Sequence, residues 1–270
     1  MIYNLRATLL LIFTAFLFFG CSSTRTVSPP QASEAPEIDG NISGWDLQRS
    51  AIEQTEVADY YATQDDEFLY IYIDVKSPAH NQAMMQSGFI IYLGNNKDDR
   101  NRTGIAYPSG TFNLLRENPA VYDSFLNNEE WFRDPQNVER LEELQDEIFD
   151  RVMIVERNGS DTNYGFIDKE QLRVDGIDIE TGENRRLTTI EMRIPLNTSS
   201  VYTISGEELW LGFEIDPPNF NIQNNDNSSM ANRRRGYGRG SGMYQGSNAA
   251  RMNMRQRMGQ YERWYLLDLN

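Results

Sequence analysis

Short apolar segments with a two-residue period recur along this chain, and this pattern is the feature that most limits how the chain folds. The clearest is Phe68–Val75, which follows an acidic turn at Asp65-Asp66-Glu67, and the next is Gly88–Leu93. Successive side chains of a strand point to opposite faces of a sheet, so these segments predict β-strands. Further segments of this kind, separated by Gly, Asn, Asp and Pro turns, are Arg151–Arg157, Tyr164–Ile167, Gln171–Ile179, Leu187–Pro195, Leu209–Ile215 and Arg263–Leu269.

Many short strands joined by polar turns predict a mostly β fold, specifically an antiparallel β-sandwich of the immunoglobulin-like or jelly-roll-like type. One segment departs from this pattern. Between Asn118 and Asp150, Leu141, Leu144 and Ile148 recur at helical spacing among charged residues, which predicts an inserted helical segment over about residues 118–150. We favour a helix that caps one end of the sandwich, and a binding helix is the alternative.

The amino-terminal residues have the parts of an export signal. Arg6 precedes the apolar run Ala7–Phe19, and a small residue stands before Cys21. The sequence Phe-Phe-Gly-Cys at 18–21 resembles the lipobox of bacterial lipoproteins. That resemblance implies a signal peptide over residues 1–20, cleavage before Cys21, and acyl chains such as palmitate on the cysteine. An ordinary secretory signal is the alternative.

Residues 21–36 are rich in Ser, Thr, Pro and Ala, which predicts a flexible tether and a folded domain over residues 37–270. No later stretch approaches the roughly 20 consecutive apolar residues of a membrane-spanning helix. We therefore expect lipid to be the anchor in the cell envelope. Ser22 gives no Asp-type retention signal, which by analogy with Gram-negative sorting indicates the outer membrane.

Charge is distributed unevenly. Residues 36–230 hold 15 Lys and Arg against 37 Asp and Glu, whereas residues 231–263 hold eight Arg and one Glu. An acidic body argues against nucleic acid as a partner. The low-complexity composition of residues 219–260 predicts a long disordered loop before the last strand. Its arginines are candidate contacts for an acidic partner, namely Arg233, Arg234, Arg235 and Arg239.

The sequence carries little that indicates catalysis. Cys21 is the only cysteine, and the only histidine is His80, which we expect in a polar turn. No metalloprotease, serine hydrolase or nucleotide-binding motif is present. This favours a protein that is not an enzyme. A glycoside hydrolase or its accessory protein remains a third alternative, because sequence does not give the separation between two carboxylates.

One region resembles a known family. Residues 37–45 read Glu-Ile-Asp-Gly-Asn-Ile-Ser-Gly-Trp and are followed by Ala58–Val75. Together they resemble the start of carbohydrate-binding module family 9, a β-sandwich related to the dopamine monooxygenase N-terminal (DOMON) domains. The resemblance covers residues 37 to about 95 and implies a sandwich that binds carbohydrate. Within the motif we expect structural roles, with Gly40 in a turn and Trp45 filling the end of the sandwich.

Carbohydrate modules stack aromatic rings on the apolar face of a sugar. Four aromatic residues outside the predicted strands are candidates for exposed stacking rings, although packing within a loop is favoured for each. Oxygen-bearing side chains also gather at residues 94–101, where Ca²⁺ is the one cofactor considered, although a solvated turn is favoured. The candidate stacking residues are Tyr107, Trp131, Tyr237 and Tyr244, and the candidate Ca²⁺ ligands are Asn95, Asn96, Asp98 and Asp99.

The sequence thus predicts a non-catalytic, lipid-anchored envelope protein that binds an extracellular ligand. The family resemblance implies that this ligand is carbohydrate. The alternative is an envelope interaction or assembly protein that contacts acidic partners through the Arg-rich segment.

Overall fold

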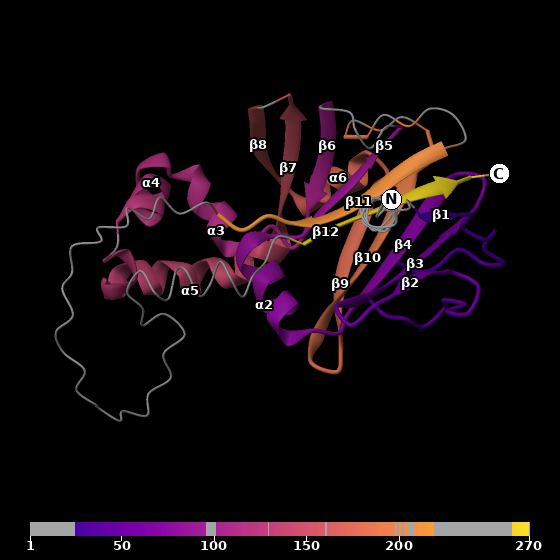
Figure 1. The fold of residues 1–270 in the computed structure, drawn as a ribbon, viewed down its shortest axis with the longest axis horizontal. Coiled ribbons are helices and arrows are strands. Elements are labelled where there is room, and N and C mark those ends of the chain that lie inside the picture. Colours follow the sequence, from indigo (N-terminus) through magenta and orange to yellow (C-terminus); the bar gives the residue numbers. More distant parts are fainter. Residues whose placement is uncertain are drawn as a thin grey trace, which may run out of the picture.

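The chain folds into two β-sheets that pack face to face, with helices at one end (Figure 1). The computed structural model describes residues 25–95, 101–128, 130–159, 161–197, 199, 201, 202, 204, 208–218 and 261–269. Every strand pair is antiparallel except β1 with β12. The predicted mostly β class and the antiparallel sandwich are confirmed.

One sheet has seven strands and the other has five. In spatial order the first contains β1 (Arg25–Val27), β12 (Tyr261–Asp268), β11 (Glu208–Ile215), β5 (Ile90–Gly94), β6 (Asn101–Ala106), β7 (Arg151–Asn158) and β8 (Asp161–Asp168). The second contains β2 (Ala51–Gln54), β3 (Ala58–Gln64), β4 (Phe68–Val75), β10 (Leu187–Pro195) and β9 (Asp178–Asn184).

Helices lie between the strands and gather mainly at one end of the sandwich (Figure 1). The longest, α5, buries Leu141 and Ile148. Its N-cap is Asp134, whose side chain accepts a hydrogen bond from the Gln136 N–H. The predicted helical insertion is confirmed. The helices are α2 (Pro78–Ser87), α3 (Thr111–Leu114), η1 (Leu115–Glu117), α4 (Pro119–Asn127), η2 (Trp131–Arg133), α5 (Pro135–Asp150) and α6 (Lys169–Val174).

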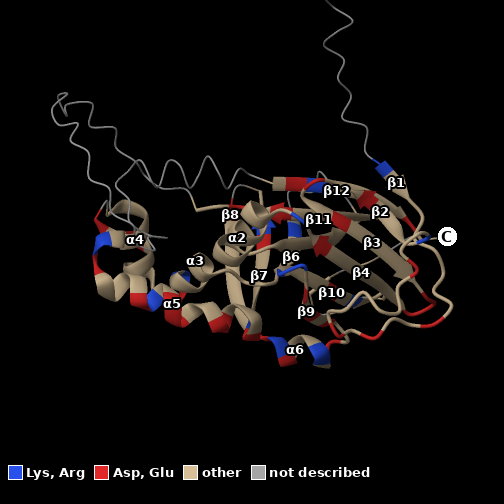
Figure 2. Ribbon diagram, turned by 90° about the horizontal axis from the view of Figure 1, so that it is seen from below, with Lys and Arg blue, Asp and Glu red and all other residues tan. Residues whose placement is uncertain are grey.

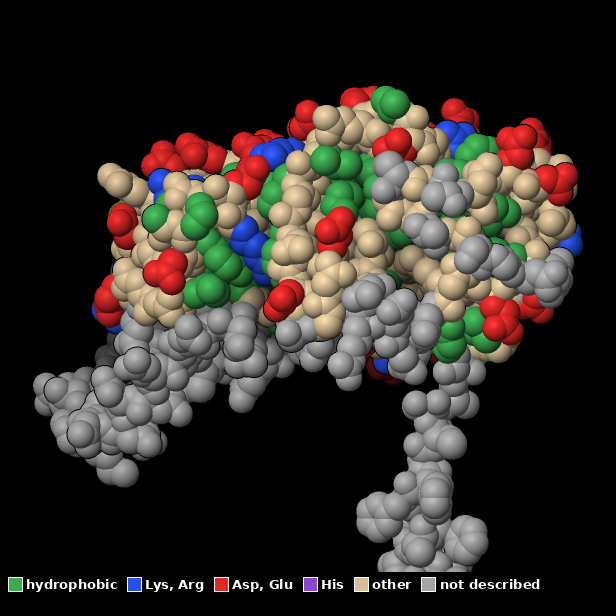
Figure 3. All heavy atoms as spheres, turned by 90° about the horizontal axis from the view of Figure 1, so that it is seen from above, with side chains coloured by type: hydrophobic (Ala, Val, Ile, Leu, Met, Phe, Trp, Pro, Cys, Tyr) green, Lys and Arg blue, Asp and Glu red, His purple; other side chains and the backbone are tan. Residues whose placement is uncertain are grey.

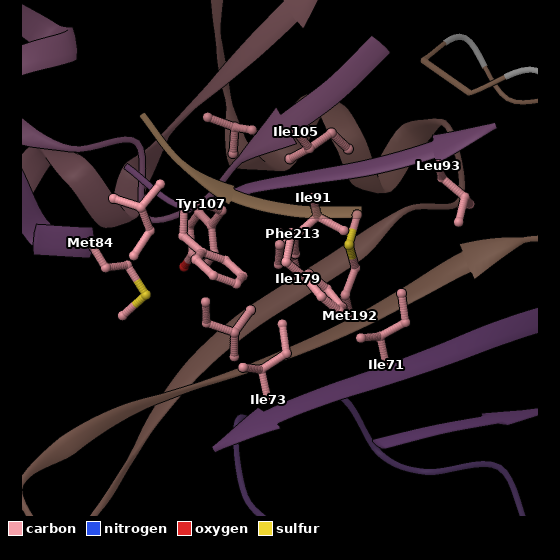
Figure 4. Packing of buried hydrophobic residues seen from close by; sticks show 14 of the residues in the cluster. Ile71, Ile73, Met84, Ile91, Leu93, Ile105, Tyr107, Ile179, Met192 and Phe213 are labelled. Atoms are coloured by element: carbon pink, nitrogen blue, oxygen red, sulfur yellow. The ribbon is translucent and has the colours of Figure 1, made fainter. Parts of the chain in front are cut away.

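The main core fills the space between the sheets, where side chains from both inner faces point toward one another (Figure 4). Phe213 of β11 stacks on Tyr60 of the opposite sheet, with ring centroids 4.7 Å apart, and on Phe89 at 5.8 Å. Burial of such rings supplies most of the favourable free energy of folding, because large apolar areas leave water.

The family-like motif at residues 37–45 is held against the outer face of the five-stranded sheet by one buried carboxylate. Glu191 accepts hydrogen bonds from the backbone N–H groups of Asp39 (3.0 Å) and Gly40 (2.9 Å) and from the indole N–H of Trp45 (2.6 Å). Trp45 also packs on Tyr72, with centroids 5.6 Å apart. Trp45 is thus structural, as predicted, although it covers a sheet face and not the end of the sandwich.

Gly40 lies where no other residue would fit. Its φ of +78° is in the region that glycine adopts without strain, and a Cβ atom there would lie 2.4 Å from the carbonyl carbon of Thr181. The Thr189 hydroxyl donates to the Gly40 carbonyl at 2.6 Å. The turn expected at Gly40 is therefore confirmed, and it brings two backbone segments into direct contact.

Three expectations about local structure are wrong. Part of the expected tether is folded, because Arg25–Val27 pairs with β12 and the Gln64 N–H donates to the Pro30 carbonyl at 3.0 Å. The expected strand Gln171–Ile179 is divided between α6 and β9, since Leu172 turns inward on a short helix. His80 lies in α2 and not in a polar turn.

Two other expectations fall outside the described residues. These are the signal peptide with Cys21, and the disordered loop over residues 219–260. Among the residues that the structure describes, no helix is both long enough and apolar enough to cross a membrane.

Replacing Glu191 by Ala tests whether this carboxylate holds the amino-terminal segment. The change leaves three N–H donors without their acceptor, and we expect a loss of about 3–5 kcal/mol in the free energy of unfolding. Chemical denaturation measures this loss. The matched control is Glu183→Ala, at an exposed position on neighbouring β9, which should change stability by less than about 0.5 kcal/mol. Equal effects of the two variants would contradict the assignment.

Candidate functional site

Two of the four tryptophans lie half-buried on the same sheet face. Trp45 and Trp131 are buried, with 8% and 1% of their surface exposed. Phe213 of β11 points into the core, and because strand side chains alternate, Trp210 of the same strand points outward. Trp264 of β12 pairs with outward-facing Gly212, so the seven-stranded sheet presents both half-buried indoles on its outer face.

Glycines let aromatic rings lie flat on this face. A Cβ atom at Gly212 would lie 2.4 Å from the Trp264 ring, and one at Gly104 would lie 2.7 Å from the Tyr92 ring. Each ring therefore covers the backbone of the strand beside it. Tyr92 and Trp264 stack on each other, with centroids 5.7 Å apart and planes 21° apart. The result is a continuous aromatic surface over β12, β11, β5 and β6.

Two arginines lie over these rings and share one buried carboxylate. The guanidinium carbon of Arg102 is 4.7 Å from the Tyr92 centroid and 5.0 Å from that of Trp264, and that of Arg157 is 5.5 Å from Tyr92. Glu214, whose side chain is 1% exposed, accepts from Arg157 at 2.7 Å and lies 3.8 Å from Arg102. Charged donors are thus fixed beside the aromatic surface.

Two further carboxylates lie beside the aromatic rings and the arginines. Glu262 accepts a hydrogen bond from the Trp264 indole N–H at 2.6 Å and lies 3.7 Å from Arg102. Asp216 lies 3.6 Å from Arg157. We name this surface the outer aromatic face, defined by Tyr92, Arg102, Arg157, Trp210, Glu214, Asp216, Glu262 and Trp264.

Burial and ion pairing have opposite effects on the pKa of Glu214. Removal from water raises the pKa of the Glu214 carboxyl above its ordinary value, and the guanidinium groups of Arg157 and Arg102 act in the opposite direction. Burial acts to lower the pKa of Arg157, but Tyr92 and the carboxylates of Glu214 and Asp216 outweigh it and raise the pKa above its ordinary value. The Arg157–Glu214 pair holds its hydrogen-bonding groups in fixed positions beside the aromatic rings.

The structure does not bring the predicted stacking residues to the surface. Tyr107 is fully buried in the main core (Figure 4), and its ring packs edge-on to Phe149. Trp131 is buried against Phe125, with centroids 5.2 Å apart. The expectation that these two rings are exposed is wrong, because the helical segment folds back and encloses both loops.

Most of the other sequence candidates lie outside the described residues. Asn95 is described, and its side-chain amide donates to the Glu208 carbonyl at 3.1 Å. Within the described part of the chain, no group of three or more His, Cys, Asp or Glu residues could hold a metal ion. The candidates outside it are Asn96, Asp98 and Asp99 for Ca²⁺, Tyr237 and Tyr244 for stacking, and Arg233, Arg234, Arg235 and Arg239 for acidic partners.

Sequence reasoning missed Trp210 and Trp264 although a signal was present. Both tryptophans stand in segments that were predicted as strands. In Leu209–Ile215 the residues Leu, Leu, Phe and Ile alternate with Trp210, Gly212 and Glu214, which places these three on one face. The alternation therefore indicated an outward tryptophan beside a glycine, which is the arrangement that the structure contains.

Comparisons with known proteins give limited further information. No protein-family model matches the chain, and no curated protein matches it. A solved structure to which the chain is similar is a carbohydrate-binding module family 9 from Caldicellulosiruptor kristjanssonii in complex with glucose. The two are 14% identical, with a TM-score of 0.34, and the match covers 72% of this chain and 78% of that one.

Replacing Arg157 by Met tests how much the Arg157–Glu214 ion pair contributes to the free energy of unfolding. In Arg157→Met the pKa of Glu214 rises further, and we expect a loss of about 3–5 kcal/mol in the free energy of unfolding near neutral pH. A carboxyl whose pKa is raised in the folded state loses stability as pH rises through that pKa, so the loss should be larger at pH 8 than at pH 5.

Denaturation curves at these two pH values measure the effect. The control is the double variant Arg157→Met with Glu214→Gln, which lacks the buried charge and should show no such pH dependence. A loss that is the same at both pH values in the single variant would contradict this account of the pair.

Proposed function

We propose that the outer aromatic face binds carbohydrate. The observation that carries this proposal is the half-buried Trp264 ring, which lies flat over Gly212 and has the ion-paired guanidinium of Arg102 over it, with the ring centroid 5.0 Å from the guanidinium carbon. A pyranose has an apolar face that packs on such a ring, and its hydroxyls take hydrogen bonds from charged groups at the rim. The family resemblance of residues 37–45 gives independent support.

The charges on this face favour a neutral sugar. Arg102 and Arg157 supply two positive charges, whereas Glu214, Asp216 and Glu262 supply three negative ones. An acidic sugar would meet a small net repulsion. Neutral hydroxyls can both donate to carboxylates and accept from guanidinium groups, so they suit a mixed set of charges.

We propose further that the protein is not an enzyme. The two carboxylates that face each other across β11 and β12, Glu214 and Glu262, both lie within 4 Å of Arg102. In a glycosidase one carboxyl protonates the leaving group and a second acts as base or nucleophile. Here the same Arg102 guanidinium holds both carboxylates, which favours hydrogen bonding to a ligand over hydrolysis.

We propose that the protein is anchored by lipid in the cell envelope. The export signal and lipobox-like residues before Cys21 support a lipid-anchored protein of the envelope, at the outer membrane of a Gram-negative bacterium. Such an anchor would hold a carbohydrate-binding domain at a surface rich in polysaccharide.

Trp264→Ala tests the sugar site. We expect the change to reduce affinity by about tenfold or more for a sugar that a glycan array identifies, because the stacking surface is lost. Isothermal titration calorimetry measures the affinity. The matched control is Phe68→Ala on the other sheet, where Arg193 lies over the ring at 4.9 Å in a similar way. Retained binding in Trp264→Ala, or an equal loss in Phe68→Ala, would contradict the proposal.

Salt and a deletion separate this proposal from the alternative of polyanion contact by the Arg-rich segment. Sugar binding at the outer aromatic face should be nearly unchanged between low and high salt and should survive removal of residues 232–260. Binding only to acidic polymers, lost with salt or with the deletion, would assign the function to the arginines at positions 233–239.

Cys21→Ser tests the anchor. Without the thiol no acyl chains can be attached, and we expect the protein to leave the membrane fraction and to lose incorporation of radiolabelled palmitate. Fractionation and label counting in the producing cells measure both. Unchanged membrane association of the variant would contradict lipid anchoring through this residue.

A further inference from the structure

Strand β8 forms one edge of the seven-stranded sheet (Figure 1). It pairs with β7 over eight consecutive positions, and within the described residues nothing pairs with its other side. Natural proteins protect such edges with Lys, Pro, bulges or a covering element. The sequence of β8, Asp-Thr-Asn-Tyr-Gly-Phe-Ile-Asp, has neither Lys nor Pro, and its register with β7 is unbroken. Because no strand of the described residues pairs with this side of β8, the edge is open to a further strand.

A groove of about 470 Å³ lies under this edge, on the inner side of the sheet. Ile154 of β7 and Ile167 of β8 line its wall, and Val174 at the end of α6 and Val201 complete the apolar lining. The volume is within the usual range of about 300–1,000 Å³ for ligand pockets. It is large enough to receive apolar side chains from a strand added to β8.

Two exposed hydrophobic side chains lie beside the groove and on β8. Among the described residues, the exposed large hydrophobic side chains are Val174, which is 88% exposed, and Tyr164 of β8, which is 40% exposed and has the Arg116 guanidinium over its ring at 3.9 Å. Val174 lies at the rim of the groove, and Tyr164 lies on the opposite face of β8. Exposed apolar groups on both faces of an unpaired edge are typical of a strand-docking surface.

The acidic side chains around the groove indicate that its partner is basic. The groove lining contains the carboxylates Glu156 and Asp175 and, among the described residues, no Lys or Arg. Asp161 and Asp168 stand at the two ends of β8 and are exposed. Seen from the side where β7 ends and β6 and β8 begin, hydrophobic side chains reach the surface with Asp and Glu side chains around them (Figure 3). Acidic residues also follow α5 and the loops around the five-stranded sheet (Figure 2).

We propose that β8 and the groove beneath it bind an extended, basic peptide segment of a partner protein by strand addition. The segment's backbone would pair with β8. Every second side chain, apolar and of about the size of valine, would enter the groove beside Ile154 and Ile167. Basic side chains beside them would lie close to Glu156 and Asp175. β8 is at the opposite edge of the sheet from β1 and β12, and the groove lies on the inner side of the sheet, whereas Trp264 lies on the outer side.

The first test uses a labelled, capped peptide of about six residues in which valine and arginine alternate, with binding followed by fluorescence anisotropy at low salt. Two further peptides carry N-methyl groups on alternate residues, in one register or the other. Strand addition uses the N–H groups of one register only, so one methylated peptide should lose at least about tenfold in affinity and the other should bind nearly as well. Loss with both, with neither, or no binding of the parent peptide would overturn the proposal.

The second test changes the charge of the groove. The double variant Glu156→Lys with Asp175→Lys should weaken binding of the unmodified peptide by at least about tenfold at low salt. The matched control is Glu142→Lys with Glu143→Lys on the exposed side of α5, which changes net charge by the same amount and should change affinity by less than about twofold. Equal losses in the two variants would show general attraction to an acidic protein and would overturn the proposal.

Discussion

The stacking of Phe213 on Tyr60 joins the two sheets, and the arrangement of the outer surface depends on it. Strand side chains alternate strictly, so an inward Phe213 requires that its neighbours Gly212 and Glu214 face outward. Pairing of β11 with β12 then places Trp264 over Gly212. A shift of one residue in β11 would bury Glu214 in the main core and expose Phe213. The same contact that stabilises the core therefore positions the aromatic surface on the opposite side of the sheet.

Two buried carboxylates, Glu191 and Glu214, are paired in different ways in this fold. Each is fully enclosed and must be paired, because an unpaired buried charge costs several kcal/mol. Glu191 is satisfied by neutral N–H donors and fixes the segment that contains Trp45. One oxygen of Glu214 accepts a hydrogen bond from Arg157, and the other lies 3.8 Å from Arg102 and accepts no hydrogen bond among the described residues; both arginines remain partly exposed. The first arrangement is closed and structural, whereas the second leaves charged groups at the surface.

Sequence patterns predicted those parts of the fold that depend on local periodicity. The strands Phe68–Val75 and Leu187–Pro195 and the helical segment carry long, regular patterns, whereas the short and polar β6 gives no such signal. The site was harder to predict, because exposure of a ring is a tertiary property. Tyr107 follows a strand and Trp131 stands among charged residues, yet the helical segment buries both. Trp264 was predicted in a strand, but only pairing with β11 shows that its ring lies on the outer face.

The central claim is that the outer aromatic face is the ligand surface, and the indole N–H signals of the four tryptophans test it most directly. In ¹H–¹⁵N spectra recorded during titration with a sugar that binds, we expect the signal of Trp264 to shift and that of neighbouring Trp210 to move with it. The signals of buried Trp45 and Trp131 should remain in place. A saturating titration in which the Trp264 signal does not move, or in which only a buried tryptophan responds, would contradict the account.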